Sequence, residues 1–123
     1  MLIDFYTMKK SRIHFEVELD NQNVPDKIYW DATDKEDDGI NQTRSISIAV
    51  WDHFQSNTMR IDLWTKDMTV DDQKRFYIDC IGGMAQSILT ATGDEFMANE
   101  MNALCTRFID HVRKELEERQ KKG

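Results

Sequence analysis

Apolar and polar residues alternate along the first half of the chain, as they do in strands that bury one face. The clearest alternation covers residues 12–20, where Ile13, Phe15, Val17 and Leu19 point to one side. The same two-residue period recurs in three further segments, over residues 27–32, 45–51 and 58–64. Because short polar connections join most of these segments, we expect four strands in an antiparallel meander.

After Thr69 the apolar residues recur every three or four positions instead, as on one side of a helix. Thr69, followed three residues later by Asp72, is typical of a helix start, and Gly93 is typical of a helix end. Asp94 can begin a second helix, which carries apolar residues as far as Leu116. We therefore expect an α+β fold, a four-stranded antiparallel meander sheet with two C-terminal antiparallel helices packed on one face.

Two adjacent glycines, Gly82 and Gly83, interrupt the middle of the first predicted helix. Glycine in a helix interior costs about 1 kcal/mol relative to alanine. Their presence predicts that another element packs closely against the helix there.

The domain organisation follows from where the alternating pattern begins and ends. Residues 1–8 do not share it, and we expect them to be an extension, with Met8 as a hypothetical start of translation. Residues 9–116 should form one domain, a size that can bury a core of its own. Residues 117–123 are almost all charged or polar, so we expect a frayed C-terminal tail.

The composition narrows the range of partners. The net charge of −7 and a pI near 4.9 repel a phosphate backbone, so nucleic acid is not an expected partner. No apolar run approaches the roughly 18 to 20 residues that span a bilayer, so we expect a cytoplasmic chain that does not cross a membrane. Cys80 and Cys105 both lie on apolar helical positions, which favours buried free thiols over a disulfide.

No pattern of an enzyme or a metal site is found. The three histidines, His14, His53 and His111, fall on a strand, a turn and a helix without metal-ligand spacing. The acidic loop over residues 34–39 begins like a calcium loop, but Ser45 occupies the position that needs a bidentate glutamate. No nucleophile motif is present, so we expect a non-enzymatic protein without cofactor or metal.

If the helices cover one sheet face, the other face carries large aromatic side chains. The predicted register places Tyr29, Trp51 and Trp64 there together with Arg60 and Asp62. Large exposed aromatics suggest a partner surface, although local packing or self-association would also account for them. In this register Trp64 lies diagonally near Tyr29, whereas Trp51 lies at the opposite end of the sheet.

Three motifs of unusual composition allow a family to be suggested. They are Lys9-Lys10-Ser11-x-Ile13-x-Phe15-x-Val17-x-Leu19-Asp20, Val24-Pro25-x-Lys27-Ile28-x-Trp30-x-Ala32-Thr33-Asp34 and Thr58-x-Arg60-Ile61-Asp62-Leu63-Trp64-Thr65-Lys66-Asp67-Met68. In these motifs, and more loosely as far as Val112, the chain resembles the gliding motility protein GldC family of Bacteroidetes.

The resemblance implies a small cytoplasmic accessory or adaptor protein that supports gliding motility and is not an enzyme. Its implied partners are other gliding motility proteins, notably the GldB lipoprotein, and a homo-oligomer is possible. The family provides no catalytic or ligand residues to carry over. Two alternatives stay open: a small chaperone, because the export chaperone SecB has the same outline of four strands and then helices, and an unrecognised ligand-binding domain.

Overall fold

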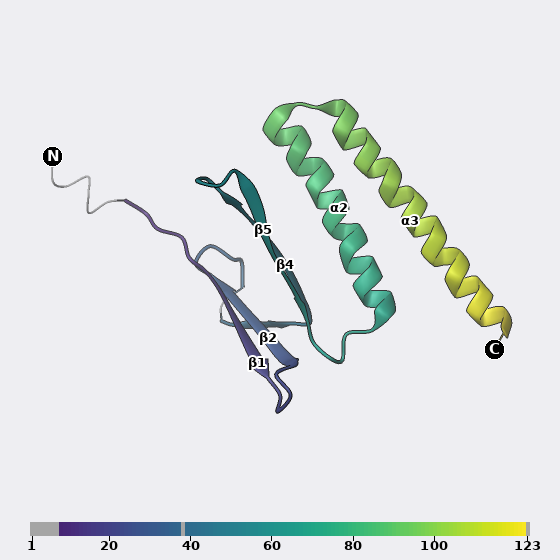
Figure 1. The fold of residues 1–123 in the computed structure, drawn as a ribbon, viewed down its shortest axis with the longest axis horizontal. Helices are drawn as coiled ribbons and strands as arrows, with labels where there is room; N and C mark the ends of the chain where they lie inside the picture. The colour runs from purple at the N-terminus through teal and green to yellow at the C-terminus, as the bar shows by residue number, and fades with distance from the viewer. Residues whose placement is uncertain (1–7, 38, 123) are drawn as a thin grey trace. The chain divides into compact units, whose positions relative to one another are not determined.

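The computed structural model describes residues 8–37 and 39–122, so residues 1–7 of the expected N-terminal extension lie outside the described residues. The elements follow one another along the chain (Figure 1) as β1 (Ile13–Leu19), β2 (Pro25–Ala32), β3 (Asn41–Thr43), β4 (Ser45–Asp52), β5 (Asn57–Trp64), α2 (Val70–Thr92) and α3 (Glu95–Lys122). They form two compact units, one with the strands, which ends at Met68, and one with the helices, which begins at Thr69. The α+β class is confirmed; a single domain over residues 9–116 and the packing of the helices on a sheet face stay predictions.

β1 and β2 form the predicted hairpin, with Phe15 opposite Trp30 and Val17 opposite Ile28. The side chain of Asp20 shapes the turn, because its Oδ1 accepts hydrogen bonds from the amides of Gln22, at 2.8 Å, and Val24, at 3.0 Å. Asn23 takes the left-handed conformation that this short turn requires, with φ of 62°. The polar turn residues therefore fix the register of the two strands.

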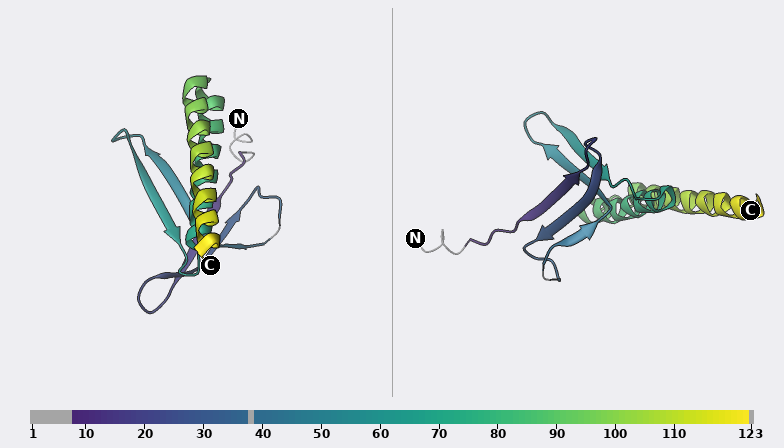
Figure 2. Two further views of the ribbon diagram at one scale, coloured as in Figure 1. Left: turned by 90° about the vertical axis from the view of Figure 1, so that its right-hand side faces the viewer. Right: turned by 90° about the horizontal axis from the view of Figure 1, so that it is seen from below.

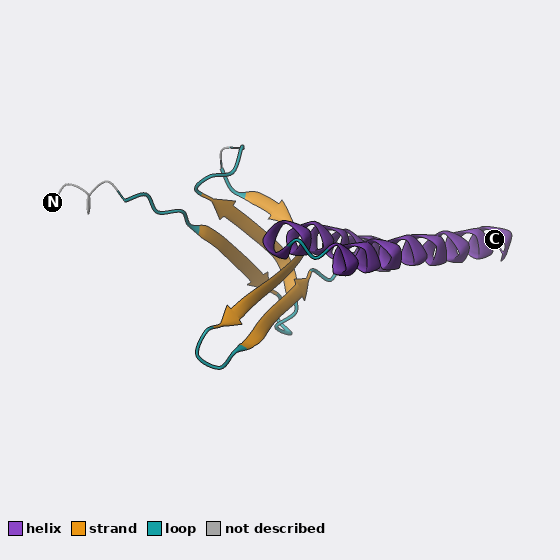
Figure 3. Cartoon of the chain, turned by 90° about the horizontal axis from the view of Figure 1, so that it is seen from above, coloured by secondary structure: helices purple, strands orange, loops and turns teal. Residues whose placement is uncertain are grey.

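The predicted four-stranded meander is wrong, because the strands form two sheets (Figure 3). β3, a short strand that the sequence pattern did not indicate, occupies the free edge of β2, with Gln42 opposite Tyr29 and Thr43 opposite Ile28. β4 consequently has no place beside β2 and pairs with β5 alone. The order is β1-β2-β3 in one sheet and β4-β5 in the other, and the two sheets diverge from the link between β3 and β4 (Figure 2).

The β4–β5 hairpin keeps the alternation that the sequence predicts, with Ile46 opposite Leu63 and Ile48 opposite Ile61. An aspartate side chain holds its turn, as in the first hairpin. Oδ1 of Asp52 accepts hydrogen bonds from the amides of Phe54, at 2.9 Å, and Gln55, at 3.1 Å. The chain therefore reverses tightly at this tip.

The buried residues of the strand unit gather where the two sheets join. Ile28 and Thr65 are fully covered, and Ser45 and Ile46 are buried beside them. Two main-chain hydrogen bonds close this junction, from Thr65 N to the carbonyl of Arg44 at 2.8 Å and from Lys66 N to the carbonyl of Pro25 at 3.0 Å. Away from the junction the apolar strand residues are exposed, as Ile13, Val50 and Met59 are, although the alternation predicted them to be core.

The helical unit begins and ends at the residues that the sequence predicts. Oγ1 of Thr69 accepts a hydrogen bond from the amide of Asp72 at 3.1 Å and caps α2. Gly93 ends α2 with φ of 72°, and its amide donates to the carbonyl of Leu89 at 2.8 Å. Oδ1 of Asp94 then accepts from the amide of Met97 at 3.0 Å, which caps α3.

The two helices run antiparallel and meet along a seam in which alternating spacings of three and four residues recur (Figure 1). Such residues are Ile78, Ile81, Ala85 and Ile88 on α2, and Ala98, Met101, Cys105, Phe108 and Val112 on α3. Ala85 and Ala98 are the buried members, because small side chains let the two backbones approach. Both cysteines are free thiols but are half-buried, where buried thiols were expected, and Sγ of Cys105 donates to the carbonyl of Ile78 at 3.6 Å.

Two other features of the helices differ from expectation. No close neighbour is found at Gly82 or Gly83: apart from the adjacent residues and the helix's own backbone, a Cβ added at either would meet no described atom within 4 Å. α3 also continues through the charged segment to Lys122, where a frayed tail was expected. Ion pairs connect this end to α2, from Arg119 to Asp71 at 2.9 Å and from Lys74 to Glu115 at 2.9 Å.

In the described part of the chain, neither helix combines the length and the apolar character that a membrane span needs.

Candidate functional site: one face of the β4–β5 hairpin

Four of the five predicted surface residues lie on one face of the β4–β5 hairpin, which we call the ribbon face. The ladder pairs Trp51 with Thr58, Ala49 with Arg60, Ser47 with Asp62 and Ser45 with Trp64. Since residues directly opposite each other in an antiparallel pair point to the same side, these eight residues form the ribbon face. Strand alternation alone therefore predicted that Trp51, Arg60, Asp62 and Trp64 share a surface.

Tyr29 does not belong to this surface. It lies on β2, in the three-stranded sheet, where its neighbours across the ladder are Glu16 of β1 and Gln42 of β3. The predicted register placed Trp64 diagonally near Tyr29 within a single sheet, and that arrangement is wrong because β3 occupies the edge of β2 and β4 pairs only with β5. The candidate surface thus divides between two sheets.

The centre of the ribbon face is a hydrogen-bonded cluster of Arg60, Asp62 and Ser47. The guanidinium of Arg60 donates from Nη2 to Oδ1 of Asp62 at 3.0 Å and to Oγ of Ser47 at 2.7 Å, and from Nε to Oδ2 of Asp62 at 3.3 Å. Oγ of Ser47 donates in turn to Oδ1 of Asp62 at 2.6 Å. A two-point contact between guanidinium and carboxylate fixes both groups in one plane, so the charges are presented in a defined orientation.

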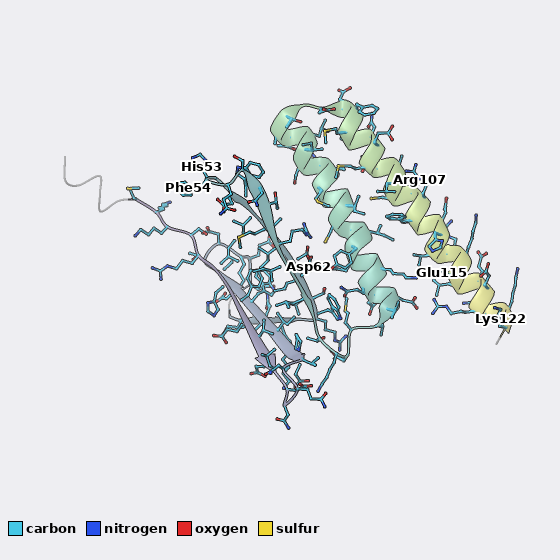
Figure 4. The ribbon with its side chains drawn as sticks, viewed as in Figure 1. His53, Phe54, Asp62, Arg107, Glu115 and Lys122 are labelled. Carbon is cyan, nitrogen blue, oxygen red and sulfur yellow. The ribbon has the colours of Figure 1, made fainter. Side chains whose placement is uncertain are left out.

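Exposed aromatic residues flank this cluster at both ends of the hairpin. Trp51, near the tip, is 63% exposed, and Trp64, at the base, is 51% exposed. At the tip itself the ring of Phe54 is 94% exposed and makes an edge contact with His53, with ring centres 5.6 Å apart (Figure 4). Phe54 was not predicted, because a turn residue falls outside the alternating pattern; the signal that could have revealed it is the aspartate-initiated turn at Asp52.

A hollow of about 230 Å³ lies beside Trp64 at the junction of the two sheets. Its lining is Val24, Pro25, Asp62, Leu63, Trp64 and Lys66. The amine of Lys66, one of these lining residues, lies 3.2 Å from a carboxylate oxygen of Asp20 and 3.5 Å from one of Asp26. The hydrogen bond to Asp20 raises the pKa of Lys66, which keeps the ammonium form. The hollow can accept a small apolar group beside one cation and one carboxylate.

The titratable residues give no sign of a catalytic or metal centre in the part of the chain that the structure describes. No group of three or more His, Cys, Asp or Glu side chains there could hold a metal ion. His14 and His111 each contact a glutamate on their own element, at 3.0 and 3.4 Å. The expectation of a non-enzymatic protein stays a prediction.

Comparison with known proteins gives one match. The family described as gliding motility-associated protein GldC-like matches residues 25–114, well over half of the chain. No curated protein and no solved structure matches. The match contains β2, β3, the complete β4–β5 hairpin, all of α2 and the part of α3 that ends at residue 114. The chain therefore belongs to the GldC-like family of gliding motility-associated proteins.

Proposed function

We propose that this protein is a cytoplasmic, non-catalytic accessory protein of the gliding machinery that binds one protein partner through the ribbon face. Family membership supports the process, gliding motility. The observation that supports a binding role is the pair of half-exposed tryptophans, Trp51 and Trp64, on either side of the fixed Arg60–Asp62 pair. Tryptophan and arginine are the residues most often found at the energetic centre of protein interfaces.

Trp64 is the expected anchor of this interface. Its ring borders the hollow, so a partner side chain that fills the hollow would contact both the indole and Leu63. Asp62 and Lys66 at the same place offer one acceptor and one donor to orient the partner. The partner we expect is another gliding motility protein, with the GldB lipoprotein as the first candidate to examine.

Binding of a small ligand in the hollow beside Trp64 is less well supported. The hollow has about 230 Å³, whereas pockets for small molecules usually measure about 300 to 1,000 Å³. A chaperone role has a specific observation in its favour, since Ile13, Val50, Phe54 and Met59 are all exposed on the strand unit. A chaperone uses such surfaces to hold many unfolded chains, whereas an accessory protein should retain one defined partner.

Replacement of Trp64 by alanine tests the proposal. We expect Trp64→Ala to reduce partner recovery at least tenfold, because truncation of an interface anchor commonly costs 2 kcal/mol or more. Recovery is measured by affinity purification of the full chain from gliding cells, followed by mass spectrometry. The circular dichroism spectrum and the melting temperature should change little, because about half of the indole is exposed.

Phe96→Ala is the matched control, since Phe96 is 72% exposed and lies on α3. It removes an exposed aromatic ring without touching the ribbon face, and partner recovery should equal that of the wild type. Equal loss in both variants, or recovery of many unrelated unfolded proteins by the wild type, would reject the ribbon face as a specific site and favour the chaperone role.

A further inference from the structure

The outer edge of the three-stranded sheet is open along β1. β1 has β2 as its only ladder partner among the described residues. The amide of Thr33 donates to the carbonyl of Arg12 at 3.0 Å, so in the alternating pattern of an antiparallel pair Arg12, His14 and Glu16 direct their main-chain groups toward β2. Ile13, Phe15 and Val17 therefore direct theirs outward, where another strand can pair with them.

The charges along β1 and the residue before it are sorted by sign. The first half carries Arg12 and His14, and the second half carries Glu16 and Glu18, all of them exposed on the same side of the strand. No ion pair of Arg12 or Glu18 occurs within the described ranges, and His14 contacts only Glu16 of its own strand. An antiparallel partner with the same sequence would bring each basic half against an acidic half.

We propose that β1 is a dimerisation edge that pairs antiparallel with β1 of a second copy of this chain, with Phe15 opposite Phe15. This register places Arg12 opposite Glu18 and His14 opposite Glu16 on the polar side, each pair occurring twice by symmetry. On the other side Ile13 lies opposite Val17. The product is one continuous sheet of six strands, with β1 of each copy at its centre.

The main chain permits this register, and the charges favour it over its neighbours. With Phe15 on the axis, the outward-directed groups of Ile13, Phe15 and Val17 meet outward-directed groups of the second copy, as hydrogen bonding requires. A shift that centres Glu16 sets two carboxylates opposite each other, and one that centres His14 sets two imidazoles opposite each other. Parallel pairing would bring like charges together along the strand, which destabilises a sheet.

The exposed apolar side chains of β1 also support pairing with a second copy of the chain. Ile13 is 70% exposed and Phe15 is 38% exposed, on the side of the sheet that also carries Trp30. In the proposed pair these residues contact Val17 and Phe15 of the second copy, so part of this apolar surface is covered. The strand is thus self-complementary on both sides, which an unrelated peptide would match only by chance.

A charge-exchange experiment on the full chain tests this inference. Sedimentation equilibrium of the wild type should give about 29 kDa, twice the 14.5 kDa of the chain. The acidic variant Arg12→Glu/His14→Glu and the basic variant Glu16→Lys/Glu18→Lys should each have a dimer dissociation constant at least tenfold higher. An equimolar mixture should recover the wild-type affinity, because three of the four opposite pairs then have opposite charges and the fourth is the His14–Glu16 pair of the wild type. A monomeric wild type at all soluble concentrations, or undiminished dimers in both variants, would overturn the inference.

Cross-linking in the otherwise unchanged chain tests the register, whether or not the charge variants fold. Phe15→Cys should form a disulfide between copies through residue 15, because opposite residues in a hydrogen-bonded pair have Cα atoms about 5.5 Å apart. Ile13→Cys is the matched control and should not cross-link to itself, since residue 13 lies opposite residue 17. Peptide mapping separates these products from any disulfide of Cys80 or Cys105. Failure of Phe15→Cys to cross-link under oxidation would reject this register.

Discussion

At the residue scale, Asp20 shows that one side chain can stabilise a turn and also connect it to a distant segment. Its Oδ1 accepts from the amides of Val24 and Gln22, and its Oδ2 accepts from Nζ of Lys66 at 3.2 Å. These hydrogen bonds, the one from Val24 first, lower the pKa of Asp20 from its ordinary value. One carboxylate thus holds the β1–β2 turn and also joins it to the segment after β5.

The lowered pKa of Asp20 predicts a pH-dependent stability. Because the folded state binds the proton less readily than the unfolded state does, the stabilisation is fully present above roughly pH 4 and is lost as the pH falls through the lower, folded pKa. Asp20→Asn keeps an acceptor oxygen but has no charge. We expect its free energy of unfolding to be lower than that of the wild type at pH 7, and the difference to shrink toward pH 3.

Urea unfolding of both proteins at several pH values measures this difference. Asp37→Asn is the control, because it removes the same charge from an exposed loop position that makes no hydrogen bond or ion pair among the described residues. A difference for Asp20→Asn that is the same at pH 3 as at pH 7 would contradict the assignment of the stabilisation to the ionised form.

At the scale of elements, α2 contains two glycines that lower its stability and that no contact explains. Gly82 and Gly83 lie in the interior of a 23-residue helix, and neither has a neighbour that would exclude a methyl group. Glycine there leaves the unfolded chain with more conformational freedom than alanine does. The two glycines therefore reduce the stability of the helical unit without a compensating contact in the described structure.

Gly83→Ala should stabilise the protein by about 0.5 to 1 kcal/mol, because alanine lowers the entropy lost on folding and meets no atom. Thermal unfolding followed by circular dichroism measures the change. Gly93→Ala serves as the opposite control, since φ of 72° at the end of α2 is unfavourable for a side chain, and it should destabilise the protein. Destabilisation by Gly83→Ala would instead reveal a close partner at this position.

The sequence predicted those elements that have local signals in adjacent residues. Strand alternation, the Thr69 cap and Gly93 are encoded in adjacent residues, so the strands β1, β2, β4 and β5, the helix α2 and the start of α3 were predicted close to their observed limits. The end of α3 was not, because its last residues carry no apolar period. The pairing of strands is not local. Asn41–Thr43 carries no apolar alternation, yet its pairing with β2 divides the strands into two sheets and separates Tyr29 from the ribbon face. The four ribbon residues share one face, as the alternation predicted, because one hairpin holds them all; their role as a partner surface stays a prediction.

At the scale of the whole molecule, the strand unit offers two surfaces on different sheets. The ribbon face belongs to β4–β5, and the proposed dimerisation edge belongs to β1. Residues that are distant and share no contacts usually contribute independently. Arg12 and His14 have no hydrogen bond or ion pair with any ribbon residue among the described residues. An experiment can therefore reject the ribbon face as the partner site without rejecting the dimerisation edge, and the reverse.

This independence leads to a prediction in which each variant is a control for the other. The acidic variant Arg12→Glu/His14→Glu should lose the dimer but recover the partner at the wild-type level per chain, because the ribbon face is unchanged. Trp64→Ala should lose the partner and still give the dimer mass in sedimentation equilibrium. Should the acidic variant lose the partner as well while keeping its circular dichroism spectrum, the partner would need two copies of the ribbon face at once. In that case the affinity gained from bivalent attachment, rather than a single contact at Trp64, would explain recruitment.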